Sequence, residues 1–162
     1  MFKEIVVMNK KAEKFQKALK TIGLEKLQAQ EIKDEFHTVI FRATAEIKGH
    51  MLPMAIYVDD TIYTIFRVLI APNVVTEGTK KIILEYLNKF NFKYKIFKYY
   101  TNDNNDLILD CCITFATEEA FNPELIRGIM DVVGEHLNSE YGNITKKIWA
   151  KVPGEKKAAK SK

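Results

Sequence analysis

The segment KYKIFKYYTNDNNDLILDCCITFATEEAFNPELIRGIMDVVGEHLNSEYGNITKKIW, residues 93–149, decides the fold. A strand rich in aromatic residues is predicted over Lys93–Tyr100, and apolar alternation predicts a returning strand over Leu107–Phe115. The Asn/Asp run 102–106 between them is typical of a turn, because these residues tolerate left-handed φ and bond their own backbone. Asn122 and Pro123 then predict the start of a helix. The segment therefore predicts a hairpin followed by a helix.

Three helices are predicted in all. Asn9 can cap a first helix that Gly23 ends, and Thr76 can cap a second one. The third starts at Asn122, and Gly142 is expected to break it. Apolar residues at helical spacing form the inner faces of the three helices: Ala12, Phe15, Leu19 and Ile22; Ile83, Leu87 and Phe90; Ile126, Ile129, Met130, Val133 and Leu137.

A meander of strands is predicted between the first two helices. Period-two alternation favours strands over residues 36–47, 52–58 and 62–70, joined by short turns. A further strand over residues 27–33 is an open alternative. Together these elements predict an α+β fold with an antiparallel sheet of five or six strands. The three main helices give the order α-β-β-β-α-β-β-α, or one strand more before the second helix.

Size and composition favour one soluble domain. A chain of 162 residues is near the usual length of a single domain, about 100–200 residues. Its apolar runs are far shorter than the ~20 residues that cross a bilayer, so no membrane partner is expected. The first residues are too short and too acidic for a secretory signal, and two adjacent cysteines cannot form a disulfide framework. We therefore predict a cytoplasmic protein.

The positive net charge is confined to the end of the chain. The formal charge is +4, and residues 150–162 carry five lysines against Glu155, which accounts for the whole excess. This lysine-rich tail has too few apolar groups to fold, so we predict that it is disordered. Residues 1–149 are predicted to form the single α+β domain, which is neutral overall.

Six short segments of the chain match a known family: Leu52-Pro53, Val58-Asp59-Asp60, Leu84-Glu85-Tyr86-Leu87-Asn88, Phe97-Lys98-Tyr99-Tyr100, Leu107-Ile108-Leu109 and Asn122-Pro123-Glu124-Leu125. On these segments the chain resembles the YbjN-like family, whose members share the fold of type III secretion chaperones. The resemblance covers roughly Met51 to Tyr141, and more loosely the first helix. The family is described as regulators of sensory transduction and has no agreed catalytic residues. The resemblance implies a compact module, often a homodimer, that holds another polypeptide.

The strand over residues 62–70 is apolar on both faces. Phe66, Val68 and Ile70 would serve one face, while Tyr63, Ile65 and Leu69 make the other apolar too. A sheet covered on one side only should be polar on the other, so something must cover the second face. The first helix or the tail of the same chain is one candidate. The other is a subunit or client, which predicts a homodimer or partner surface over Tyr57, Tyr63, Ile65 and Leu69.

Lysines alternate with aromatic residues over Lys93–Tyr100. Such a strand could stack bases and neutralise phosphates, and a solvated edge strand blunted by lysine has the same pattern. We favour the edge strand, so a nucleic-acid partner is not expected. A nucleic-acid-associated regulator that uses this strand and the basic tail is the alternative function.

No metal or cofactor site is predicted. Cys111 and Cys112 are neighbours on a strand and point to opposite faces, so they cannot ligate one ion together. The run Asp103–Asp106 lacks the Gly and the bidentate Glu of a calcium loop. The histidines lack metal-ligand spacing: His37, His50 and His136.

Catalysis is not predicted either. An acidic cluster of Asp59, Asp60, Asp110 and Glu46 would need suitable strand pairing, and turn formation explains the first two equally well. An enzyme built on Asp59, Asp110 and a histidine is the least favoured reading. The sequence thus predicts a non-enzymatic protein-interaction module, chaperone-like or regulatory, that binds a polypeptide partner.

Overall fold

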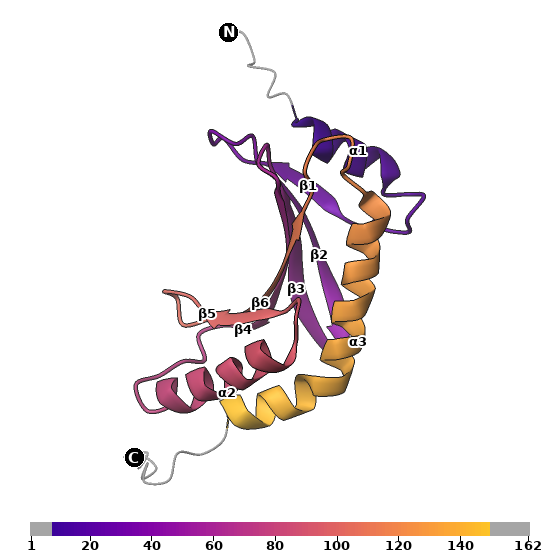
Figure 1. The fold of residues 1–162 in the computed structure, drawn as a ribbon. Helices are drawn as coiled ribbons and strands as arrows, with labels where there is room; N and C mark the ends of the chain where they lie inside the picture. The colour runs from indigo at the N-terminus through magenta and orange to yellow at the C-terminus, as the bar shows by residue number, and fades with distance from the viewer. Residues whose placement is uncertain (1–7, 150–162) are drawn as a thin grey trace, which may run out of the picture.

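The computed structural model describes residues 8–149, which form three helices and one six-stranded antiparallel sheet (Figure 1). The strand order across the sheet is β1-β2-β3-β4-β6-β5. The elements in chain order are α1 (Lys10–Ala18), β1 (Gln28–Glu31), β2 (Val39–Ile47), β3 (His50–Val58), β4 (Tyr63–Ala71), α2 (Lys80–Lys93), β5 (Lys98–Thr101), β6 (Leu107–Thr114) and α3 (Pro123–Ile148).

The α+β class, the three helices and the antiparallel sheet confirm the prediction at that level. The order α-β-β-β-α-β-β-α was one strand short. β1 is present before β2, as the alternative allowed, and pairs with it through Ala29 opposite Phe41. The predicted disorder of residues 150–162, and residues 1–7, lie outside the described residues.

All three helices lie on the same face of the sheet (Figure 1). Phe15 of α1 packs edge-on against Phe41 of β2, with ring centroids 4.8 Å apart, and also contacts Phe121 just before α3. At the other end of the sheet, Phe90 of α2 packs against Tyr99 of β5. The alternation of the strands therefore buries one set of side chains in a core between sheet and helices.

The predicted caps at Asn9 and Asn122 are confirmed. The Asn9 side chain accepts a hydrogen bond from the backbone N–H of Ala12, and it donates to the backbone carbonyl of Val58 in β3. Asn122 accepts from the N–H of Glu124, and Pro123 is the first residue of α3. Both helix starts are thus fixed locally, and the first is also tied to the sheet.

Four predicted boundaries are wrong. α1 ends at Ala18, whereas Gly23 was expected to end it. α2 starts at Lys80, and Thr76 lies in the preceding turn, where its hydroxyl bonds that of Thr79. Gly142 lies inside α3 and does not end it. The expected strand over residues 93–100 is mostly not a strand, because α2 runs to Lys93 and β5 begins only at Lys98.

Buried stripes explain why two of these helices run longer. Tyr94 continues the spacing of Leu87 and Phe90, and its ring stacks on Phe90. In α3 the buried stripe continues past Gly142 through Tyr141, Ile144 and Ile148. A glycine inside a helix costs about 1 kcal/mol, less than the burial of even one of these side chains stabilises.

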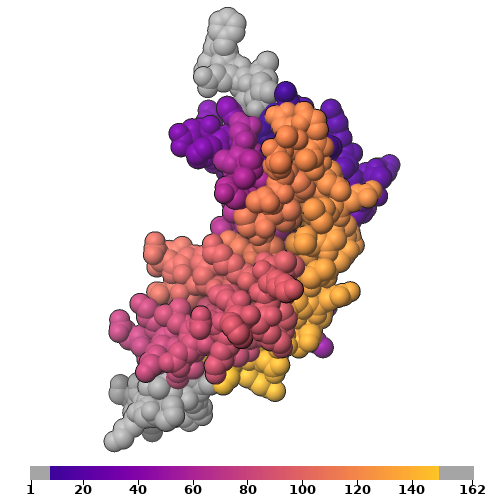
Figure 2. Space-filling model, in the orientation of Figure 1, coloured from indigo at the N-terminus to yellow at the C-terminus, as the bar shows by residue number. Residues whose placement is uncertain are grey.

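The molecule is hollowed on the side away from the helices. Figure 2 shows this hollow between the β1–β2 and β3–β4 connections at one end and the β5–β6 hairpin at the other. The strands bend along their length so that the uncovered face of the sheet turns toward it (Figure 1). None of the helices between residues 8 and 149 combines the length and apolar character needed to span a membrane.

Candidate interaction surface

The sheet surface turned away from the three helices is called the open face here. Strand pairing arranges its side chains in rows that run across the strands. One row joins Ile40, Tyr57, Ile65 and Cys112. The next joins Arg42, Ala55, Arg67, Asp110 and Lys98. A third joins Leu69, Ile108 and Tyr100.

All four residues predicted for the interaction surface lie on the open face. Tyr57, Ile65 and Leu69 are half-buried, and Tyr63 is 50% exposed. The first helix does not cover them, because α1 packs on the opposite face through Phe15. Among the described residues, no helix lies over these four side chains (Figure 1). The tail, the other candidate from the same chain, lies outside the described residues.

A salt bridge lies at the centre of the open face. Nε and Nη2 of Arg67 donate to the two carboxylate oxygens of Asp110, each at 2.8 Å. Asp110 is only 3% exposed, and the Tyr100 hydroxyl donates to its Oδ2 at 3.0 Å. The guanidinium also lies over the Tyr57 ring, 4.9 Å from the centroid. Arg67 and Tyr100 thus supply the hydrogen bonds of the Asp110 carboxylate, which is almost fully buried although no helix lies above it.

The pKa values of Arg67 and Tyr100 are both raised next to Asp110. The hydrogen bonds to Asp110 raise the pKa of Arg67, so its charge is permanent. Burial, followed by the negative charge of Asp110, raises the pKa of Tyr100 to about 12. The centre of the open face therefore holds one fixed ion pair and a neutral phenol near pH 7.

Two further cations flank this centre. Arg42 is exposed on β2 and donates to the side-chain carbonyl of Gln30. Lys98 is exposed on β5, with its ammonium 4.9 Å from the centroid of the Tyr100 ring. Between residues 8 and 149, neither makes an ion pair within 4.0 Å. The open face thus presents apolar side chains between two cations that lack a carboxylate partner in the described chain.

The two cysteines point to opposite faces, as predicted. Cys111 is buried in the core, where burial raises the pKa of its thiol to about 12. Cys112 is exposed on the open face opposite Ile65, and burial raises its pKa as well. Neither thiol is activated as a nucleophile.

Each of the three histidines has a different set of neighbours. His136 lies on the covered face among aromatic rings, with its Nε2 2.6 Å from the Tyr99 hydroxyl. His37 pairs with Asp60 at an exposed turn. His50 packs against the ring of Tyr141. Across residues 8–149, no three His, Cys, Asp or Glu side chains are grouped so that they could hold a metal ion.

The acidic residues considered for catalysis do not converge. Asp59 lies in the β3–β4 turn and accepts from Thr61, while Asp110 lies at the middle of β6, bound to Arg67. Glu46 lies near the far end of β2. The run after Asn102 forms the β5–β6 turn, in which the Asn102 side chain accepts from backbone N–H groups. The structure does not bring these carboxylates into one site.

The basic and aromatic residues predicted to share one strand are also separated. Tyr94 and Phe97 point toward His136 on the covered face, with ring centroids 4.5 and 4.2 Å from the imidazole. Tyr99 is buried beside them. Lys98 and Tyr100 lie on the open face, so this segment does not form the continuous row of rings that the alternative interpretation would need for base stacking. β5 is an edge strand that carries Lys98, as the other interpretation expected.

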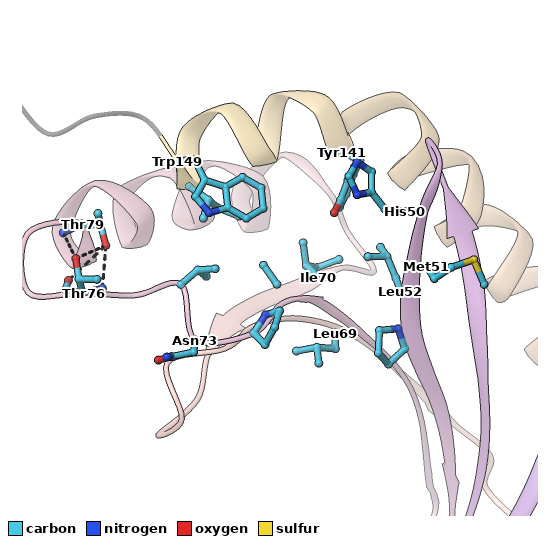
Figure 3. Close-up of a pocket in the computed structure, with 15 residues that line it drawn as sticks. His50, Met51, Leu52, Leu69, Ile70, Asn73, Thr76, Thr79, Tyr141 and Trp149 are labelled. Carbon is cyan, nitrogen blue, oxygen red and sulfur yellow. Dashed lines mark hydrogen bonds between the residues drawn. The ribbon is translucent and has the colours of Figure 1, made fainter. Parts of the chain in front are cut away.

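The sequence reasoning missed a cleft of about 840 Å³ at the end of the sheet (Figure 3). Tyr141 and Trp149 of the α3 end lie on one side of it, and Leu52 and Ile70 lie across from them. The Thr76–Thr79 turn closes another side. The expected break at Gly142 hid part of this cleft, because the prediction ended α3 before Ile148 and Trp149, which line it.

Comparison with known proteins adds no relative: no protein-family model matches this chain, and no curated protein matches it.

Proposed function

We propose that this protein is a non-enzymatic interaction module that binds a polypeptide through the open face of its sheet. The observation that carries the proposal is a six-stranded sheet with all three helices on one side and an apolar surface, centred on a buried ion pair, on the other. Apolar side chains left on an uncovered sheet face mark a surface that a partner buries.

The open face is large enough for a stable complex. Its longest strands have nine residues, about 30 Å, and six strands span about 24 Å. That extent is comparable with the ~800 Å² that each partner buries in a standard interface. The aromatic side chains Tyr57, Tyr63 and Tyr100 are of the type that dominates binding energy at such surfaces.

The resemblance to the YbjN-like family agrees with this proposal, since the secretion-chaperone fold that the family shares implies a module that holds another chain. We place this activity in the cytoplasm, where Cys112 stays a thiol. A regulatory or chaperone role would follow from which polypeptide the open face holds.

A second copy of the chain is the second candidate, because Tyr57, Tyr63, Ile65 and Leu69 share one continuous face. Light scattering over a range of micromolar concentrations tests it. A dimer through this face predicts that Leu69→Asp gives a mass near 18.7 kDa. It also predicts that Cys112 reacts more slowly with iodoacetamide as the protein concentration rises.

The matched control is Phe92→Asp. Phe92 lies near the end of α2, outside the open face, and is 94% exposed. Loss of association in this variant, with Leu69→Asp unchanged, would place the interface on the helical side. A monomer at every concentration would remove the homodimer and leave only a different polypeptide as the partner.

A further inference from the structure

We propose that the open face binds an amphipathic helix that carries acidic residues near both ends of its apolar stripe. This names the partner for the proposed function and rests on it. The proposal depends on three features of the described residues: the hydrogen bonding of the sheet, the bend of its strands, and the two cations that lack a carboxylate partner.

The hydrogen bonding of the sheet favours a helix over an extended peptide. β2, β3, β4 and β6 each pair with a neighbour on both sides, so the open face offers side chains and no free backbone groups. An extended peptide on this face would leave its own N–H and C=O groups without partners. A helix satisfies its backbone internally and needs only side-chain contacts.

The shape of the open face also fits a helix. Figure 2 shows the molecule hollowed on this side, and a helix with its side chains is a cylinder about 10 Å across. Tyr57 and Ile65 lie on one side of the ion pair along the strands, and Leu69 lies on the other. These half-buried side chains would contact the apolar stripe of the incoming helix.

The charges fix the polar chemistry of the partner. Arg67 is already neutralised by Asp110, whereas Arg42 and Lys98 have no carboxylate within 4.0 Å in residues 8–149. They belong to the same cross-strand row, four strand spacings apart, or about 19 Å. A helix lying along this row would meet them about 13 residues apart, since its rise is about 1.5 Å per residue. Acidic residues at those two places would pair with both cations.

The same row of charges disfavours a dimer in which the open faces of two copies pack directly against each other. A twofold axis along the strands would place Arg42 over Lys98 of the other copy, and an axis along the row would place each cation over itself. Glu46 is the single acidic residue of β2, four residues from Arg42, and does not lie in the row. The repulsion makes a partner with carboxylates the better complement.

The test uses three labelled synthetic peptides and fluorescence anisotropy with the whole chain. The first is an amphipathic helix of about 18 residues, five turns, with a leucine stripe and glutamates near both ends. The second replaces its glutamates by lysines. The third has the composition of the first in scrambled order, so it lacks the apolar stripe. We expect the first peptide to bind at least about tenfold more tightly than either control, and to weaken as salt is added.

Variants of the protein locate the contact. The double variant Arg42→Glu with Lys98→Glu should bind the acidic peptide about tenfold more weakly, since each exposed pair is worth up to about fivefold. It should also gain affinity for the lysine peptide. Leu69→Asp should abolish binding of both. The matched control, Lys89→Glu with Lys146→Glu, changes the net charge equally at exposed positions on the helical side and should leave binding unchanged.

If the acidic and lysine peptides bind equally well, and Leu69→Asp abolishes the binding of both, the proposal of an acidic partner helix is overturned. The proposed function would still stand. If both double variants lose the same affinity for the acidic peptide, this proposal is also overturned, because the affinity would then depend only on the net charge of the protein. A dimer that Leu69→Asp dissociates would show that a second copy occupies the face. Binding of none of the peptides by a monomeric chain would overturn this inference and the proposed function together.

Discussion

The two faces of the sheet each contain one buried polar pair, and the pairs differ in kind. On the covered face, Tyr99 and His136 form a hydrogen bond within a cluster of aromatic rings, and burial keeps both neutral. On the open face, Arg67 and Asp110 form a full ion pair. A helix layer excludes water and selects neutral groups. On the open face, Arg67 stays partly in contact with solvent, so its charge is tolerated there. A charged partner could be tolerated at this surface for the same reason.

The largest expected difference between the faces is in packing. Phe41→Ala removes a fully buried ring from the covered face, where Phe15 packs against it. We expect a loss of about 4 kcal/mol in the free energy of unfolding, measured by urea denaturation, because the cavity cannot be refilled by neighbours. A loss below about 1 kcal/mol would mean that the helices pack loosely on this face.

The next largest effect should come from the ion pair. Arg67→Met leaves the buried carboxylate of Asp110 without its cation. We expect this change to lower the free energy of unfolding by about 3 kcal/mol near pH 7. Adding Asp110→Leu to Arg67→Met should restore most of the stability. A double variant no more stable than Arg67→Met would contradict the role of charge at this site.

A smaller effect is expected for the neutral pair on the covered face. Tyr99→Phe removes the hydroxyl that bonds His136 and should cost about 1 kcal/mol in thermal or urea unfolding. Tyr100→Phe on the open face provides the matched control, since its hydroxyl bonds Asp110. A larger loss in Tyr100→Phe than in Tyr99→Phe would reverse the ranking of the two pairs.

The same imidazole gives the covered face a pH dependence. Burial lowers the pKa of His136 below 6.5; nearby Glu140 opposes this shift and Lys93 adds to it. Below pH 6.5 the unfolded chain therefore takes up this proton more readily than the folded one, so the free energy of unfolding should fall as the pH drops. His136→Gln should have a flatter profile between pH 7 and mildly acidic pH, and an unchanged profile would show that other groups cause the dependence.

The smallest effect should come from the apolar residues of the open face. Leu69→Ala removes a side chain that is half-buried in the described chain, so we expect a loss of at most about 1 kcal/mol. Any loss beyond that, present only at high protein concentration, would indicate that association buries Leu69. Ile65→Ala should behave in the same way.

The sequence predicted the features that depend on local pattern. The alternation of Tyr63, Ile65 and Leu69 against Phe66 and Val68 placed each side chain on its correct face, because period two leaves no other choice. Asn9 and Asn122 predicted their caps because an Asx side chain acts within three residues.

The prediction failed where distant packing decided the outcome. Lys93 belongs to a helix because Phe90 and Tyr94 meet His136 of α3, and Gly142 stays helical because Tyr141 and Ile144 are buried. The ion pair was not predicted either. Arg67 and Asp110 are 43 residues apart, and only the pairing of β4 with β6 brings them together. That pairing skips β5 and follows from no local signal.

The packing of Phe15 against Phe121 has a consequence for how the chain is made. These two rings are far apart in the sequence, at positions 15 and 121, yet their centroids lie 6.3 Å apart. At a translation rate of about 5–20 residues per second, Phe15 of α1 is synthesised roughly 5–20 s before Phe121. During that interval the apolar side of α1 can contact Phe41 of β2 but lacks the part of its native cover that Phe121 provides. The nascent protein must therefore delay its final collapse until the last third of the chain emerges.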